Sequence, residues 1–103
     1  MRQVLSRYEQ MYDQLDASAA PSIWPQVDSR ALARVFARLE RQDLTFDGCV
    51  LAVSDITATA ECTGWLSYVP RVGPQTPHRE HHSWTIELAR DAASWQIVKV
   101  TGK

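Results

Sequence analysis

Long apolar segments, cysteine-rich motifs and an excess of charge of one sign are all missing from this sequence of 103 residues. No stretch approaches the roughly 18 apolar residues that a membrane-spanning helix needs, so we expect no membrane insertion. Two cysteines are too few for a disulfide-built scaffold or a metal cage, and we expect both to be reduced and buried. The formal net charge of -1 argues against nucleic-acid binding driven by charge.

The composition that is present is that of one ordinary globular domain. Hydrophobic residues make up 45% of the chain and charged residues 22%, without low-complexity tracts, and this combination rules out intrinsic disorder. We expect a single domain over residues 1–103, because a chain of this length needs one nearly continuous core. The first fifteen residues lack the apolar centre of a secretory signal, so we expect a cytoplasmic protein.

The first part of the chain has the spacing of short helices. Apolar residues at intervals of three and four predict a helix over about Arg2–Leu15. Asp16 can cap a short turn through Ala17–Ala20, after which two prolines interrupt any long helix and leave a compact, irregular elbow. A further helix, capped by Asp28 or Ser29, is expected to turn four side chains inward: Leu32, Val35, Phe36 and Leu39.

From Leu44 onward the apolar period changes to two, which indicates strands. The first strand, over about Leu44–Ser54, changes phase in its middle, so we predict a β-bulge at Asp47–Gly48. A two-residue turn at Asp55–Ile56 leads into a second strand whose even positions face the core, and it places Cys49 and Cys62 on the same buried face. Two more strands are predicted, over residues 78–90 and 95–101, joined by a turn over residues 91–94.

Runs of helix followed by runs of strand predict an α+β domain, with the helices packed on one face of a four-strand antiparallel meander. Symmetric pairing around the loop over residues 71–77 sets a register for the second and third strands. The predicted pairs are Tyr68 with Glu80, Leu66 with His82, Gly64 with Trp84, and Cys62 with Ile86.

Several segments in this order resemble the nuclear transport factor 2-like superfamily: RYEQMYDQLD, IWPQVD, LERQDLTFDGC, ATAECTGWLSYVPRVG and SWQIVKV. The superfamily includes SnoaL-like and ketosteroid isomerase-like proteins, and the chain is most similar to small bacterial domains appended to kinases or other regulatory proteins. The resemblance implies a cystatin-like cone, in which a strongly curved sheet wraps around the first helix and leaves a cavity at its open end. Members range from enzymes to catalytically silent dimerisation modules, so the fold does not fix the function.

The acid–base residues depart from the enzymatic members. Isomerase-like members place an aspartate base and a tyrosine donor in the cavity, and dehydratase-like members use a histidine–aspartate pair. Asp13 and Asp16 instead fall at the end of the first helix, and Asp47 falls at the predicted bulge. Pro21 lies in what is usually a helical segment of the superfamily and alters the expected cavity. We therefore expect no catalytic residue and no cofactor.

All three histidines lie between His78 and His82. A metal site is one interpretation, but alternate residues of a strand are about 6.6 Å apart, too far for His78, Glu80 and His82 to converge on one ion. We therefore expect no metal. The other interpretation is a polar rim beside aromatic walls that holds a small apolar ligand. The predicted ligand-binding residues are Tyr12, Trp24, Tyr68, Glu80 and His82.

Trp65 is a large ring on the outward face of the predicted sheet, among short hydroxyl-bearing side chains. Short neighbours let a partner sheet approach, and the ring would supply an anchor. We predict a two-fold contact between copies of the chain that includes Trp65, Val69 and His81.

Three functional hypotheses follow. The first is a nonenzymatic, dimerising interaction module with a small apolar cavity, part of a bacterial regulatory system. The second is a small isomerase or dehydratase acting on a polyketide- or steroid-like substrate, with His82 as base and Tyr68 or Tyr12 as proton donor. The third is a sensing domain in which ligand occupancy shifts the geometry of the dimer.

Overall fold

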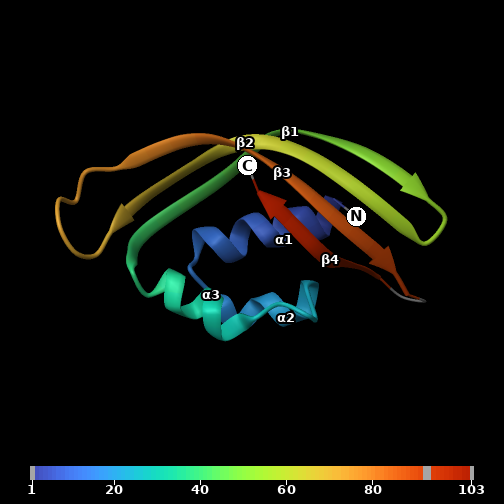
Figure 1. Ribbon diagram of the computed structural model, residues 1–103, viewed down its shortest axis with the longest axis horizontal. Coiled ribbons are helices and arrows are strands. Elements are labelled where there is room, and N and C mark those ends of the chain that lie inside the picture. Colours follow the sequence, from blue (N-terminus) through green and yellow to red (C-terminus); the bar gives the residue numbers. More distant parts are fainter. Residues whose placement is uncertain (1, 92–93, 103) are drawn as a thin grey trace.

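The computed structural model describes residues 2–91 and 94–102, and it has the α+β architecture that the sequence predicts. Figure 1 shows a curved antiparallel sheet arching over helix α1 (Arg2–Asp13), with α2 (Ala20–Ile23) and α3 (Ser29–Phe36) on the far side of α1. A single 3-10 turn, η1 (Ala17–Ala19), precedes α2. None of the described helices is long and apolar enough to cross a membrane.

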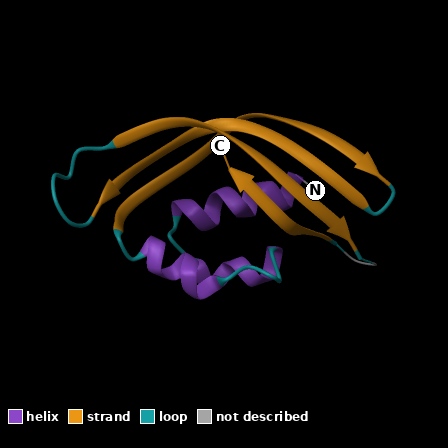
Figure 2. Cartoon of the chain, in the orientation of Figure 1, coloured by secondary structure: helices purple, strands orange, loops and turns teal. Residues whose placement is uncertain are grey.

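The sheet is a meander of four strands in the order β1-β2-β3-β4 (Figure 2). Its strands run over Leu39–Ser54 (β1), Thr57–Pro70 (β2), His78–Arg90 (β3) and Trp95–Gly102 (β4). The predicted turn at Asp55–Ile56 is confirmed, because Ser54 pairs with Thr57 across it. Part of the predicted turn after β3, residues 92–93, lies outside the described residues.

The predicted caps of the short helices are confirmed. The Asp16 carboxylate accepts the N–H of Ser18 at 3.1 Å, and the Asp28 carboxylate accepts the N–H of Ala31 at 3.0 Å. Helix α3 is shorter than predicted, however, and β1 begins at Leu39. The sequence pattern did not predict the early part of β1 because a polar residue, Gln42, occupies one of its buried positions and interrupts the alternation of apolar and polar residues.

The predicted division of the sheet into two faces holds through most of β2 and β3. Side chains at even positions of both strands join the core beneath the sheet: Ala58, Ala60, Cys62, Trp84, Ile86 and Leu88. Two inward predictions were wrong. Val35 is 55% exposed because α3 ends one residue later, and Ile56 is exposed because it sits in the turn.

The bulge predicted at Asp47–Gly48 is present. Phe46 pairs with Gly64 and Gly48 with Thr63, so that Asp47 is the extra residue of β1. The shift places Cys49 directly opposite Cys62 with their Cα atoms 4.0 Å apart, and the two form a disulfide. The expectation of two reduced, buried thiols was therefore wrong. Cys62 is buried, but Cys49 is exposed.

The predicted register of β2 and β3 was wrong by two residues. Tyr68 pairs with His78, Gly64 with His82, and Cys62 with Trp84. The predicted register placed the ring of Trp84 over Gly64, but a different contact requires a glycine at this position. A Cβ atom on Gly64 would lie 2.2 Å from the carbonyl oxygen of Thr45, because the β1 backbone closes on β2 beside the bulge.

Two carboxylates of α1 attach the helix to the outer edge of β1. Asp13 Oδ1 accepts the N–H of Leu44 at 2.7 Å, and Glu9 Oε2 accepts the N–H of Phe46 at 2.9 Å. Residues four apart on a helix and two apart on a strand each share one side, so the two bonds form together. They occupy N–H groups that an edge strand would otherwise leave unpaired. Partial burial raises the pKa of Asp13, while the bond from Leu44 acts in the opposite direction.

Gly64→Ala should lower the free energy of unfolding by about 2 kcal/mol, because the added methyl group must displace the backbone of β1. Urea denaturation followed by circular dichroism measures the change. Gly48→Ala is the matched control, since a Cβ atom there meets nothing within 4 Å; its effect should stay within about 0.5 kcal/mol. Equal destabilisation by the two variants would contradict the close approach at Gly64.

Candidate functional site

The polar rim predicted from the histidine cluster forms in part. Glu80 Oε1 and His82 Nε2 lie 2.8 Å apart on one side of β3, and the His82 ring lies 5.9 Å from the ring of Trp84. Both side chains remain partly open to solvent. No three His, Cys, Asp or Glu side chains within residues 2–91 and 94–102 come together as a metal site.

Tyr68 pairs with His78 rather than with Glu80 or His82. Its ring stacks on His78 at 5.0 Å, and it lines a pocket of about 300 Å³ beside the β2–β3 loop. The residues that line this pocket are Arg41, Gln42, Asp43, Ser67, Tyr68, Val69 and Pro77. Gln42 is only 8% exposed, and its Oε1 atom has no hydrogen-bond partner. A buried amide oxygen without a partner lowers the stability of the fold, so its presence beside this pocket marks a candidate binding site.

Tyr12 and Trp24 belong to the interior rather than to either feature. The Tyr8 hydroxyl donates to the Tyr12 hydroxyl at 3.2 Å, and the Tyr12 ring meets Phe36 edge-on at 5.3 Å. Burial raises the pKa of Tyr8, so its hydroxyl stays protonated. Trp24, at the end of α2, packs against the core. The pocket beside Tyr68 includes none of the other four predicted ligand-binding residues, and their shared role stays a prediction.

On the convex face, one chain of contacts joins three strands. Asp47, the extra residue of the bulge, accepts a hydrogen bond from Thr63 Oγ1 at 2.6 Å, and its other oxygen lies 3.2 Å from His81 Nε2. The bonds from Thr63 and His81 lower the pKa of Asp47. The His81 ring then meets the Trp65 ring edge-on at 4.9 Å, and the guanidinium of Arg79 lies 4.0 Å from the centre of the Trp65 ring.

We call these five residues the convex cluster: Asp47, Thr63, Trp65, Arg79 and His81. Trp65 and His81 lie there together, as the prediction for an outer-face contact requires, and both keep some exposure. Val69 does not share this property. It is only 6% exposed within the chain itself, so its side chain offers little surface to a partner.

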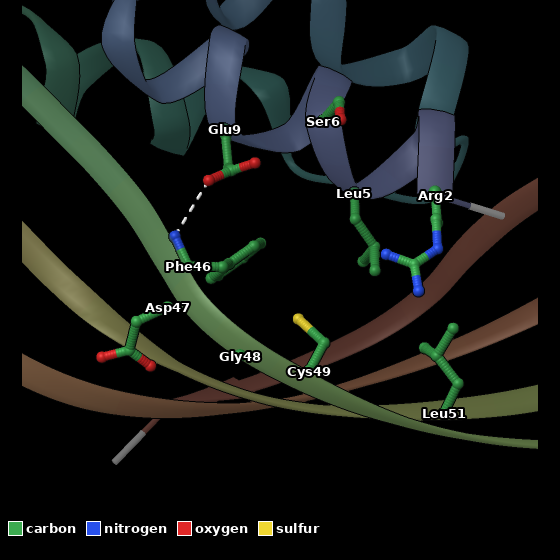
Figure 3. Close-up of a pocket in the computed structure, with 9 residues that line it drawn as sticks. All are labelled: Arg2, Leu5, Ser6, Glu9, Phe46, Asp47, Gly48, Cys49 and Leu51. Carbon is green, nitrogen blue, oxygen red and sulfur yellow. Dashed lines mark hydrogen bonds between the residues drawn. The ribbon is translucent and has the colours of Figure 1, made fainter.

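A groove between α1 and β1 was not foreseen from the sequence. It encloses about 350 Å³, and Figure 3 shows the side chains that line it. They are Arg2, Leu5, Ser6, Glu9, Phe46, Asp47, Gly48, Cys49 and Leu51. The sulfur of Cys49 points into this groove from β1 (Figure 3). The groove depends on the docking angle of α1, which the sequence pattern does not specify, although the predicted bulge placed Cys49 on the correct face.

This architecture is similar to that of several solved structures. No protein-family model matches the sequence, and no curated protein matches it either. Solved structures do match. A nuclear transport factor 2 (NTF2-like) superfamily protein from Salmonella enterica superposes with a TM-score of 0.84 at 16% identity, over 98% of this chain and 85% of that one.

Two further structures have names that refer to an activity. A protein from Streptomyces avermitilis, whose name proposes a dehydratase of the NTF2-like family, matches with a TM-score of 0.83 at 14% identity over 96% of this chain and 90% of its own. The hexachlorocyclohexane dehydrochlorinase LinA-type3 from Novosphingobium barchaimii matches with a TM-score of 0.80 at 15% identity, over 97% and 80%. At these identities the similarity shows the fold: the chain has the NTF2-like, cystatin-like fold that its sequence predicts.

Proposed function

We propose that this chain is a nonenzymatic interaction module whose convex sheet face binds a second copy of the same chain, with Trp65 at the centre of the contact. The observation that carries the proposal is the convex cluster. Asp47 fixes His81, and His81 and Arg79 together fix the ring of Trp65. An aromatic anchor that is already ordered loses little entropy on binding, which is a property of strong contact residues.

The surroundings of Trp65 suit the approach of another sheet. Four of its neighbours on the convex face carry short hydroxyl side chains: Thr63 and Ser67 two residues away on β2, Thr45 directly opposite on β1, and Ser83 diagonally opposite on β3. Such residues keep the face flat, so that a large ring can reach the backbone of a facing sheet. Most of the apolar volume of the domain is used elsewhere, in a core that the rings of Tyr8, Tyr12, Phe36 and Phe46 help to fill.

A second copy is the partner that the charges favour. Besides Asp47 and Arg79, the convex face carries Glu61, and it carries the cross-strand pair of Glu87 and Lys99. Both signs are therefore present on one face, and a two-fold axis can bring opposite charges together. A formal net charge of -1 gives two copies little general repulsion.

A small ligand is the second element of this proposal. The pocket beside Tyr68 has a volume near the lower end of the range for ligand sites, about 300–1,000 Å³. The buried Oε1 atom of Gln42 has no partner, so a movement of this side chain toward the pocket would let a ligand donate a hydrogen bond to it.

The oligomeric state tests the dimer. Trp65→Glu should convert a dimeric wild type into a folded monomer, because it places a charge at the centre of the contact. Size-exclusion chromatography with light scattering measures the mass, and circular dichroism checks the fold. Val72→Glu is the matched control, since Val72 is 88% exposed in the β2–β3 loop, and it should remain dimeric. A monomeric wild type, or a dimeric Trp65→Glu variant, would remove the proposal.

A small lyase or isomerase is the second candidate function, and the Glu80–His82 pair favours it. A carboxylate 2.8 Å from an imidazole can orient the ring and stabilise its protonated form, as a general base requires. The names of the Streptomyces and Novosphingobium structures refer to elimination reactions, and such reactions need a base.

Release of chloride from hexachlorocyclohexane is a direct probe of that candidate. If His82 is the base, His82→Gln should lower the rate of chloride release by about 10²–10⁴-fold while the protein stays folded. An ion-selective electrode records the rate. Absence of chloride release from the wild type, or an unchanged rate in the variant, would argue against His82 as an eliminating base.

A further inference from the structure

The two sulfurs of the Cys49–Cys62 disulfide have different surroundings. Cys62 is only 1% exposed and belongs to the hydrophobic core. Cys49 is exposed and lines the groove between α1 and β1. In Figure 3 its sulfur points away from β1 and into the groove. A molecule that reaches the disulfide from solvent therefore meets the sulfur of Cys49.

The geometry of thiol–disulfide exchange makes this difference important. A thiolate attacks one sulfur while the other sulfur departs as the leaving group. Attack on Cys62 would have to occur through the packed core, where it is covered. Attack on Cys49 can proceed from the groove, with the sulfur of Cys62 as the leaving group.

The groove also carries groups that can select a thiol. The guanidinium of Arg2 extends from α1 toward the sheet near Cys49, whereas the carboxylate of Glu9 lies at the other end beside Phe46 (Figure 3). Leu5 and Leu51 provide apolar surface near Cys49. Arg2 at one end, with Glu9 and Asp47 at the other, complements a small molecule that bears both a carboxylate and an ammonium group. The volume of about 350 Å³ suits a molecule the size of a short peptide.

We infer that Cys49 is a thiol-exchange site for small zwitterionic thiols of the cysteine-peptide class. The thiolate of the small molecule attacks Cys49 Sγ, forming a new sulfur–sulfur bond and breaking the Cys49–Cys62 bond. The Cys62 sulfur leaves as a thiolate and takes a proton from water. A second small thiol can then attack the mixed disulfide, releasing an oxidised dimer of the small molecule and leaving Cys49 as a free thiol. Two small thiols are oxidised and one protein disulfide is reduced.

This site lies on the opposite face of the sheet from the proposed dimer contact. The groove lies between α1 and the sheet, on the concave side, whereas the convex cluster lies on the opposite face. Asp47 connects the two, because it borders the groove at the bulge and bonds His81 on the convex side. Exchange at Cys49 would give the domain a response to the thiol content of its surroundings.

The test uses the folded wild type and glutathione. The folded protein is incubated with reduced glutathione, the reaction is quenched with N-ethylmaleimide in urea so that the buried Cys62 can also react, and peptides are mapped by mass spectrometry. The expected product carries glutathione on Cys49 and maleimide on Cys62. Glutathione found mainly on Cys62, or no adduct in the folded protein when the urea-unfolded protein reacts, would overturn the inference.

Charge selection has its own controls. Arg2→Gln should slow the reaction with glutathione by about two- to fivefold, the range of an exposed ion pair, and leave the rate with uncharged 2-mercaptoethanol unchanged. Arg7→Gln, which removes an exposed arginine of α1 outside the groove, should alter neither rate. Equal slowing of both thiols by Arg2→Gln, or no effect on glutathione, would overturn the assignment of the ligand class.

Discussion

One extra residue in β1 governs both faces of the sheet. Because Asp47 is inserted between the pairs Phe46–Gly64 and Gly48–Thr63, Phe46 and Cys49 can both face the concave side. The same insertion frees the side chain of Asp47 to bond Thr63 and His81 on the convex side. The buried core, the disulfide and the convex cluster therefore share a single local cause.

The two hydrogen bonds from the carboxylates of α1 to β1 connect the bulge to the position of the helix. Glu9 accepts a hydrogen bond from the N–H of Phe46 immediately before the bulge, and Asp13 accepts one from the N–H of Leu44, two residues earlier in β1. Hydrogen bonds to a charged group contribute roughly 1.5–3 kcal/mol each, so the pair fixes the position of the helix along the strand. Beyond the bulge the carboxylates of α1 make no such bond among the described residues, and there the groove opens beside Cys49.

Periodicity predicted the features that depend on one strand at a time. The alternation of β2, the phase change at Asp47–Gly48 and the turn at Asp55–Ile56 are all local, and the structure confirms them. The register of β3 was wrong because a seven-residue loop does not fix pairing, and the clash that requires Gly64 comes from Thr45, nineteen residues earlier in the sequence.

The candidate sites were harder to predict for the same reason. Glu80 and His82 are neighbours on one strand, so their pairing could be expected. The position of Tyr68 follows from the β2–β3 register, whereas the positions of Tyr12 and Trp24 follow from how the helices dock. Cys49 and Cys62 were placed on one face correctly. Their bond was missed because composition alone suggested free thiols, and the direct opposition of the two residues outweighs that argument.

The most direct test of the bulge is to delete Asp47 and count free thiols in the folded, air-oxidised variant, with a maleimide reagent added under denaturing conditions. If Asp47 is the extra residue, its removal makes the existing pairs consecutive, Cys49 still opposes Cys62, and no free thiol is found. If β1 were regular, the deletion would turn Cys49 to the other face. Both cysteines would then react with the reagent, which would contradict this account.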